Sequence, residues 1–367
     1  MGPHCDAMRD NHGALASTGT RSTLSAHGSP PASIASLTSL RFFAALHVVF
    51  LHYFPRTSVW VSHGYLGVSF FYTLSGFILT YTYWTRRTTY AAFLRARFAR
   101  VYPMYFVAWG LAAIPVCVHR FAVDAPWTAL VKLGVSGTLS AFLLQAWVPS
   151  LSASWNPPAW SVSCEFSFYL CFPALLGLFR KSPRLWIGVA AAYWLFTEGV
   201  LVFLGMRHPT WFAVLKFLPL AHIQEFLVGV ASYGLYVQMP KPWRLPFEFW
   251  AAFLAVVLSF PHVAWFPAMH NGLLAPVFGL MILSLAWRRA WTIALLDRKE
   301  LRLLGEASYS IYILQSPICY LFGLLHAIDS MALFALFVVV LTALAIACFF
   351  LVERPMRARI RGGTVTG

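Results

Sequence analysis

The sequence predicts an all-α fold: a polytopic integral membrane helix bundle of about ten transmembrane helices with both termini in the cytoplasm. Hydrophobic residues make up 59% of the 367 residues and charged residues only 11%, whereas soluble domains have about 25% charged and 45–50% apolar residues. Apolar runs long enough to cross a hydrocarbon core about 30 Å thick also recur along most of the chain. No water-soluble fold of this length could bury so much apolar surface.

The predicted membrane domain covers residues 36–355. Residues 1–35 are rich in Ser, Gly, His and Pro and lack the apolar stretch of a signal peptide, so we expect a disordered N-terminal tail there. Residues 356–367 are expected to form a basic cytoplasmic C-terminal tail. The predicted spans are 36–54, 64–84, 101–118, 160–179, 185–205, 211–237, 247–261, 272–287, 303–326 and 330–352.

Basic residues indicate the orientation of these spans, because cytoplasmic loops carry an excess of Lys and Arg. With ten crossings, 21 basic residues fall on the side of the two tails, and four on the opposite side: Arg56, Arg120, Lys132 and Arg207. An eleventh crossing at 133–148 would invert every later loop, so this apolar segment is predicted to be re-entrant or interfacial on the outer side. The net charge of +15 therefore indicates membrane topology, and no nucleic-acid partner is expected.

The six cysteines form no CxxC or other metal-ligand spacing, and five of them lie in or beside apolar segments. We expect them to be packing residues. The sequence also contains no phosphate-binding glycine loop and no internal repeat. We therefore expect no metal site and no tightly bound cofactor.

Ionisable side chains inside the predicted spans are candidates for a functional site, because a charge at the bilayer centre costs about 2.5–3.5 kcal/mol even on lenient insertion scales. Arg41 and His52 are eleven residues apart, which is three helical turns plus about 20°, so they share one helix face. Glu165 needs a buried partner. Glu225 follows His222 by three residues and either forms a structural pair with it or takes part in function. The other residues of this kind are His47, Glu198, Lys216 and Glu306.

A series of short motifs runs through the predicted spans. The first is an arginine, Arg41, followed eleven residues later by His52. The others are a GVSFFYTLSGF motif, an RxxR motif, a tryptophan-serine-glutamate helix and three later elements, at residues 67–77, 97–103, 160–169, 225–229, 304–312 and 353–355. In this order the series resembles the membrane-bound acyltransferase-3 family, and the resemblance spans nearly everything from residue 40 to residue 355.

The resemblance implies a set of site residues. The family histidine that matches His52 is taken to be essential, and an imidazole that titrates near neutral pH suits a general base. Glu165 either orients this imidazole or holds the acceptor, and Arg41 either binds donor phosphate or stabilises the developing negative charge. Arg97 and Arg100 are expected to bind the phosphates of coenzyme A, with positive-inside anchoring as the alternative. Positions expected to bind the acceptor or support the site are Ser75, Trp160, Ser161, Glu225, Ser308 and Tyr309.

The resemblance also implies a reaction. It is the transfer of an acyl group, usually acetyl, from acetyl-CoA (an acyl-CoA co-substrate) to a hydroxyl of a carbohydrate or lipid-linked sugar, as in exopolysaccharide-, lipopolysaccharide- and macrolide-type O-acyltransferases. The expected surroundings are the lipids of a bacterial inner membrane. Two positions depart from the family pattern: Ser69 stands where aspartate is frequent, and Gln315 stands where many members carry histidine. No role is carried over to either.

A membrane transporter of a polar or glycosylated substrate is the alternative, because intramembrane Arg, Glu and His also mark substrate and proton pathways. Repeat symmetry would favour a transporter, and the sequence shows none. A lipid desaturase would need clustered histidines for iron, and no HxxxH or HxxHH spacing occurs. The sequence therefore favours the acyltransferase.

Overall fold

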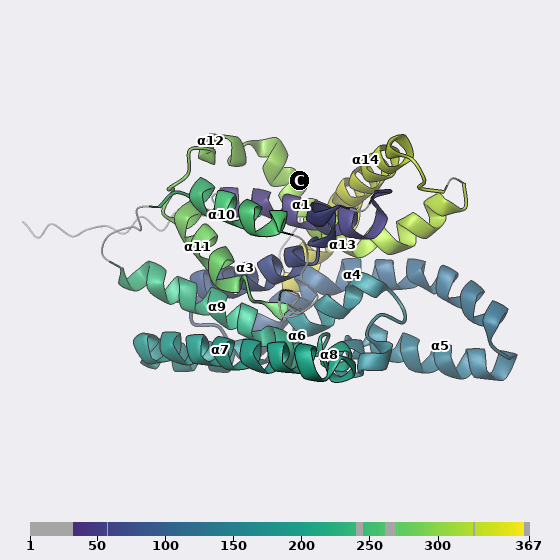
Figure 1. Cartoon of the computed structure of the whole chain (residues 1–367), viewed down its shortest axis with the longest axis horizontal. Coiled ribbons are helices and arrows are strands. Elements are labelled where there is room, and N and C mark those ends of the chain that lie inside the picture. The colour runs from purple at the N-terminus through teal and green to yellow at the C-terminus, as the bar shows by residue number, and fades with distance from the viewer. Residues whose placement is uncertain are drawn as a thin grey trace, which may run out of the picture.

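A computed structural model describes residues 32–56, 58–239, 245–260, 269, 271–325 and 327–362. Every regular element within these residues is a helix (Figure 1). The predicted all-α class is therefore confirmed. The predicted tail at residues 1–35 lies almost entirely outside the described residues, since the first helix begins at Ala32.

Long helices alternate with short helical turns along the chain. The α-helices are α1 (Ala32–Tyr53), α2 (Val59–Ser62), α3 (Leu66–Tyr83), α4 (Tyr90–Val123), α5 (Pro126–Ala141), α6 (Trp160–Lys181), α7 (Pro183–Arg207), α8 (Pro209–Leu215), α9 (Pro219–Gln238), α10 (Phe247–Ser259), α11 (Ala275–Ala286), α12 (Ile293–Leu296), α13 (Lys299–Gly323), α14 (Met331–Cys348) and α15 (Arg354–Arg361). The connection from α5 to α6 contains 3-10 turns at Gln145–Trp147, Pro149–Leu151 and Pro157–Ala159. A π-helix joins α14 directly to α15 over Phe349–Glu353.

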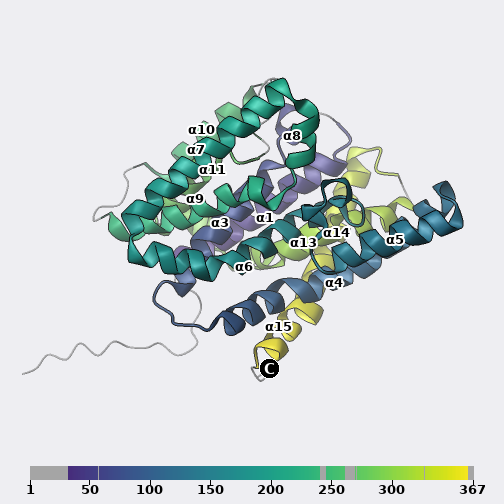
Figure 2. The same cartoon turned by 90° about the horizontal axis from the view of Figure 1, so that it is seen from below.

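Two closely packed helix pairs, α1 with α13 and α3 with α9, form the centre of the bundle. Glycines allow the close approach. A Cβ atom at Gly229 of α9 would overlap the Thr73 carbonyl of α3, and one at Gly305 of α13 would overlap the Thr38 carbonyl of α1. Small residues at such contacts are typical of helices in a lipid environment, where association depends on close van der Waals packing. α7 packs against α9, and α14 packs against α13 (Figures 1 and 2).

Several helical stretches are long and apolar enough to cross a membrane. By length and composition, five such stretches occur in the described residues: Ala35–Tyr53, Tyr90–Val123, Pro157–Lys181, Pro183–Arg207 and Met331–Arg361. A sixth is obtained if α8 and α9, which meet at a bend of 64°, form one span. These helices support the predicted membrane bundle. The number of ten spans and the cytoplasmic placement of both termini stay predictions.

The boundaries of several predicted spans differ in the structure. The predicted span 101–118 is part of α4, a helix of 34 residues that starts eleven residues earlier. The predicted span 211–237 is broken into α8 and α9, because Pro219 lacks the backbone N–H needed to continue the first helix. The predicted spans 247–261 and 272–287 contain α10 and α11, of 13 and 12 residues. At 1.5 Å per residue these helices are about 20 and 18 Å long.

The segment 133–148, predicted to be re-entrant or interfacial, contains the end of α5 and a 3-10 turn. α5 runs back alongside α4 (Figure 2), and its 16 residues extend about 24 Å. The chain then turns at Leu143, where φ is 58°, an uncommon value for a residue other than glycine. Ser163 Oγ donates a 2.5 Å hydrogen bond to the Leu143 carbonyl and ties the turn to α6. The position of this segment relative to the membrane stays a prediction.

Candidate active site

A cavity of about 160 Å³ lies between α1, α3, α4, α6 and α13; it is called the arginine cavity below. Seven of the eleven residues singled out from the sequence line it: Arg41, Ser75, Arg97, Arg100, Ser161, Glu165 and Tyr309. Three further tyrosines complete its polar wall: Tyr72, Tyr169 and Tyr312. The fold thus gathers residues from five helices into one chamber.

Arg41 of α1 and Glu165 of α6 bring opposite charges to this cavity. The Arg41 guanidinium lies 6.0 Å from the centre of the Phe71 ring and forms no hydrogen bond or ion pair with the residues that the structure describes. The Glu165 charge attracts it from across the cavity. Glu165 Oε1 accepts a 2.8 Å hydrogen bond from Ser75 Oγ of α3. The cavity therefore presents an unpaired cation and an oriented carboxylate.

Arg97 of α4 is held by aromatic rings. Its guanidinium lies 5.8 Å from the centre of the Tyr83 ring, 5.9 Å from that of Phe93 and 6.0 Å from that of Tyr169. Cation–π contacts of this kind orient a guanidinium without neutralising its charge. The buried Nε atom has no hydrogen-bond partner among the described residues. Arg97 is thus a second positioned cation whose charge is not paired.

Arg100, one turn further along α4, is paired with Glu353. The Glu353 side chain is 0% exposed and forms ion pairs with Arg100 and with Arg357 of α15. Ser310 Oγ of α13 donates a 3.2 Å hydrogen bond to its second oxygen. Removal of either arginine would leave this buried carboxylate poorly compensated, which is usually strongly destabilising. Glu353 therefore links α4, α13 and α15 at the edge of the arginine cavity.

A hydrogen-bonded wall bounds one end of the cavity. Tyr312 Oη and Ser161 Oγ lie 2.7 Å apart, and each is 3.0 Å from the Pro158 carbonyl. Tyr72 Oη donates a 3.0 Å hydrogen bond to the Ser161 carbonyl. A second cavity, of about 260 Å³, is lined by residues from α4, α13 and the 153–157 segment, among them Asn156, Pro157 and Ser316. Pro158, which accepts the two hydrogen bonds of the wall, directly follows this segment.

His52 lines neither cavity. It stands about 16 Å along α1 from Arg41, and its side chain is exposed. Its Nδ1 lies 2.8 Å from the Val48 carbonyl. Because a carbonyl only accepts hydrogen bonds, Nδ1 carries the proton of the neutral ring and Nε2 keeps a lone pair. The neighbouring Tyr53 Oη is 2.9 Å from Ser316 Oγ, a residue of the second cavity, so His52 lies at that end of α1.

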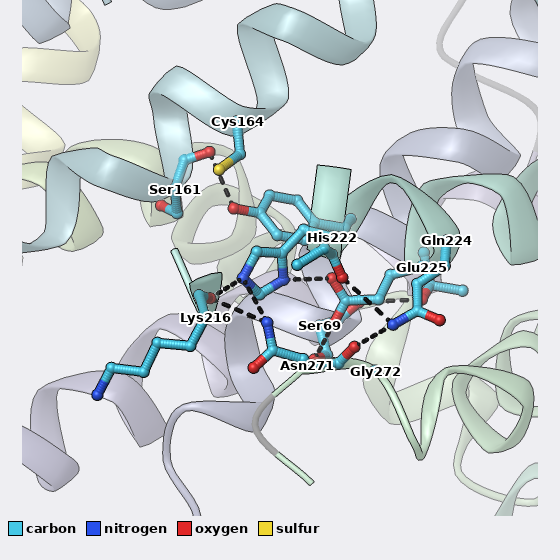
Figure 3. Close-up of polar contacts among 12 residues, drawn as sticks. Ser69, Ser161, Cys164, Lys216, His222, Gln224, Glu225, Asn271 and Gly272 are labelled. Atoms are coloured by element: carbon cyan, nitrogen blue, oxygen red, sulfur yellow. Dashed lines mark hydrogen bonds and ion pairs between the residues drawn. The ribbon is translucent and has the colours of Figure 1, made fainter. Parts of the chain in front are cut away.

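A separate polar cluster surrounds the break between α8 and α9 (Figure 3). Glu225 accepts hydrogen bonds on both oxygens, one from Ser69 Oγ and one of 2.8 Å from His222 Nδ1. His222 Nε2 lies 2.7 Å from the Lys216 carbonyl and 3.1 Å from Asn271 Nδ2. Ser69, His222 and Glu225 are at most 1% exposed. Of the two interpretations from the sequence, the structure therefore contains the pairing of Glu225 with His222. Neither residue lines the arginine cavity, but the Tyr72 ring of that cavity packs against His222, with 5.4 Å between ring centroids.

Trp160 and Ser308, two other residues singled out from the sequence, also lie outside the arginine cavity. The Trp160 ring packs against the rings of His222 and Phe217, with 5.0 Å between centroids in both cases. Ser308 is fully buried, and its Oγ donates a 2.7 Å hydrogen bond to the Gly305 carbonyl of its own helix. In the structure both residues make packing contacts.

Three residues next to these sites were not identified from the sequence. Tyr312 closes the wall of the arginine cavity, Arg357 shares Glu353 with Arg100, and Asn271 contacts His222. The contacts of Tyr312 and Asn271 join segments that lie far apart in the chain, so no local pattern predicts them. Arg357 follows Glu353 by only four residues, a spacing at which helical side chains meet. In the described part of the chain, no three His, Cys, Asp or Glu side chains form a group that could hold a metal ion.

Comparison with known proteins identifies the family. The model of an acyltransferase domain, acyltransferase-3, matches residues 34–354. The chain belongs to the acyltransferase-3 family. Members of this family are embedded in membranes, in agreement with the apolar helices described above. The resemblance noted in the sequence is therefore confirmed over almost the whole described chain.

Relatives within the acyltransferase-3 family come from several bacteria. The chain is 34% identical to acyltransferase MdmB of Streptomyces mycarofaciens, over 54% of the chain and 56% of that protein. It is 27% identical to the exopolysaccharide production protein ExoZ of Rhizobium meliloti, over 86% and 96%. It is 25% identical to the peptidoglycan O-acetyltransferase OatA of Listeria monocytogenes, over 78% and 49%. The match thus spans about half the length of MdmB and of OatA. No solved structure matches the chain significantly.

Proposed function

We propose that the protein is a membrane O-acyltransferase of the bacterial inner membrane. It moves an acyl group, acetyl in the simplest case, from acyl-CoA to a sugar hydroxyl of an exopolysaccharide, a lipopolysaccharide or another glycosylated acceptor. The observation that carries this proposal is the arginine cavity, where Arg41 and Arg97 form no hydrogen bond or ion pair with the described residues. Unpaired cations inside a helix bundle are costly, and an anionic ligand would compensate them.

Acyl-CoA fits this requirement because it combines phosphates with a thioester. Guanidinium groups bind phosphate oxygens through two parallel hydrogen bonds. In the proposed reaction the acceptor hydroxyl oxygen attacks the thioester carbonyl, so a C–O bond forms and the C–S bond breaks. The hydroxyl proton passes to a base, and the coenzyme A thiolate leaves and takes up a proton. The products are an O-acyl ester and free coenzyme A.

His52 is the proposed base. Its Nδ1 is held by the Val48 carbonyl, so Nε2 is the nitrogen that takes the proton. Arg41 stabilises the negative charge that develops on the donor. Because Glu165 lines the arginine cavity and His52 does not, we assign Glu165 to a polar group of the bound donor and not to the imidazole. Ser75 holds the Glu165 carboxylate in position.

The two cavities suggest separate routes for donor and acceptor. The thioester stands at the end of the long, flexible pantetheine arm, so a donor held by its phosphates at Arg97 extends the acyl group into the bundle. The acceptor approaches by the second cavity, which lies at the same end of α1 as His52. With both termini cytoplasmic, the donor enters from the cytoplasm and the acceptor from the opposite side.

The names of two relatives support a carbohydrate acceptor. One is named for exopolysaccharide production and the other is a peptidoglycan O-acetyltransferase. Both names refer to a glycan, and the second also names O-acetyl transfer, the reaction proposed here. Which glycan serves as acceptor is determined by the experiment below.

The test uses membranes that contain the protein, incubated with acetyl-CoA labelled in its acetyl group. We expect label in a glycan or lipid-linked sugar fraction as an alkali-labile ester. His52→Ala should reduce this transfer by about 10²-fold or more, the usual contribution of a general base. His47→Ala is the matched control, since His47 lies on the same helix and is bonded to the Trp60 carbonyl. Absence of covalent transfer by the wild type, with uptake of a glycosylated solute, would overturn the proposal in favour of a transporter.

A further inference from the structure

The C-terminal helix α15 packs against the start of α4 (Figure 2). Its sequence, RPMRARIR, contains four arginines and no acidic residue. Residues 356–361 of the predicted C-terminal tail belong to this helix and so lie beside the membrane domain. The helix begins directly after Glu353, the buried partner of Arg100. α15 therefore stands at the edge of the arginine cavity.

Two of the four arginines interact with charges of the arginine cavity. Arg357 is paired with Glu353, and its positive charge interacts with those of Arg41 and Arg97. The charge of Arg361 interacts with that of Arg97. Arg357 and Arg361 are four residues apart, so they lie within about 40° of each other on the helix. Arg359 lies about 180° from the middle of that face and is exposed.

The positive charges of this group outnumber the negative charges that the protein places beside them. Arg97, Arg100, Arg357 and Arg361 bring four positive charges together, and in the described part of the chain their one carboxylate partner is Glu353. Three positive charges remain. These like charges repel each other, and a ligand with several negative charges removes that repulsion. A phosphate monoester alone carries about −1.5 to −2 charges near neutral pH.

We propose that α15 forms the outer part of the donor site and that Arg357 and Arg361 bind phosphates of acyl-CoA beside Arg97. This inference rests on the proposed function. It extends the donor site to the phosphates of acyl-CoA, at the end of the donor that lies farthest from the thioester. Arg357 is half-buried next to the cavity, and it binds the diphosphate together with Arg97. Arg361 is exposed at the end of the helix and binds the 3′-phosphate.

Kinetics with shortened donors test this assignment. The full-length protein in lipid nanodiscs is assayed with acetyl-CoA and with acetyl-pantetheine, which has the same thioester and no phosphate. Arg361→Ala should raise the KM for acetyl-CoA about tenfold, the effect of one lost charge-assisted hydrogen bond, with kcat nearly unchanged. The KM for acetyl-pantetheine should stay at the wild-type value. Arg361 has no hydrogen-bond or ion-pair partner among the described residues, so its removal should leave folding intact.

Arg359→Ala is the matched control, because it removes the same charge from the opposite face of the same helix. Its KM for acetyl-CoA should equal that of the wild type. An equal rise in Arg359→Ala, or a rise for acetyl-pantetheine in Arg361→Ala, would show a general electrostatic or structural effect and overturn the proposal. Arg357→Lys, which keeps a cation beside Glu353, should raise the acetyl-CoA KM without changing that of acetyl-pantetheine.

Acetyl-dephospho-CoA, which lacks only the 3′-phosphate, tests the position of Arg361. Wild type and Arg361→Ala should have the same KM for this donor; a persistent tenfold difference would contradict the assignment of Arg361 to the 3′-phosphate. Failure of the proposed function gives a different result. In that case the wild type itself transfers no acetyl group from any of the three donors.

Discussion

Two groups of charges lie inside the helix bundle, and they are built in opposite ways. In the cluster at the α8–α9 break, both oxygens of Glu225 accept hydrogen bonds and both nitrogens of His222 have partners. In the arginine cavity, Arg41 and Arg97 form no hydrogen bond or ion pair with the described residues. Removal of one partner of a buried pair is strongly destabilising, whereas removal of a buried charge that forms no pair is not. We infer that the first group holds the helices together and that the second binds substrate.

The largest expected effect comes from breaking the paired group. Glu225→Ala leaves His222 and Ser69 without their carboxylate, and loss of one partner of a buried pair destabilises a protein by about 3–5 kcal/mol. We expect a lower unfolding temperature in detergent and less protein in the membrane. Glu165→Gln is the control, since Glu165 lines a cavity and glutamine keeps an acceptor for the Ser75 hydroxyl; the unfolding temperature should change much less. Equal thermal stability of the two variants would contradict the division into two groups.

Arg41→Ala tests the unpaired group. Loss of a positioned cation that stabilises developing charge should lower acetyl transfer about 10²-fold. The unfolding temperature should stay the same or rise, because the substitution removes a cation that the protein does not neutralise. Acetyl transfer in membranes and thermal unfolding of the purified variant measure both quantities. A strongly destabilised Arg41→Ala protein would mean that this arginine supports the fold.

Arg97→Ala should act on donor binding. We expect the KM for acetyl-CoA to rise about tenfold with kcat nearly unchanged, as for an interaction made equally in the ground state and the transition state. Arg95→Ala is the control, because Arg95 is exposed on the same helix and does not line the cavity. If the KM of Arg97→Ala equals that of the wild type, the alternative interpretation of Arg97 as a positive-inside anchor is favoured.

The smallest effect is expected at Ser75. Ser75→Ala removes the hydrogen bond that orients Glu165, and one such bond is worth about 1 kcal/mol. We expect a decrease of about fivefold in kcat/KM for acetyl-CoA. Ser75→Thr keeps a hydroxyl at this position and should recover most of the activity. Wild-type activity of Ser75→Ala would show that the orientation of Glu165 does not limit the reaction.

The sequence predicted the helical class and seven of the residues that line the arginine cavity. Five of these seven came from the resemblance to the family. Composition excluded a soluble fold, and the rule that intramembrane charges are costly pointed to Arg41 and Glu165. The rule does not say how far apart two such residues lie along the helix axis. Arg41 and His52 share a helix face, yet about 16 Å of helix separates them. The contacts of Tyr312 with Ser161 and of Arg100 with Glu353 depend on tertiary packing between distant segments. The break between α8 and α9, in contrast, coincides with Pro219, a local signal inside the predicted span 211–237.

The π-helix between α14 and α15 adjusts the phase of one continuous helix. Its i→i+5 hydrogen bonds hold about one residue more per turn than an α-helix, so everything after Glu353 is turned by about 100° relative to an uninterrupted helix. The apolar helix α14 packs against α13, and the basic helix α15 packs against α4. Straightening these five residues into an α-helix would swing Arg357 and Arg361 away from Arg97. A single extra residue in one turn thus lets the same helix follow two unrelated surfaces.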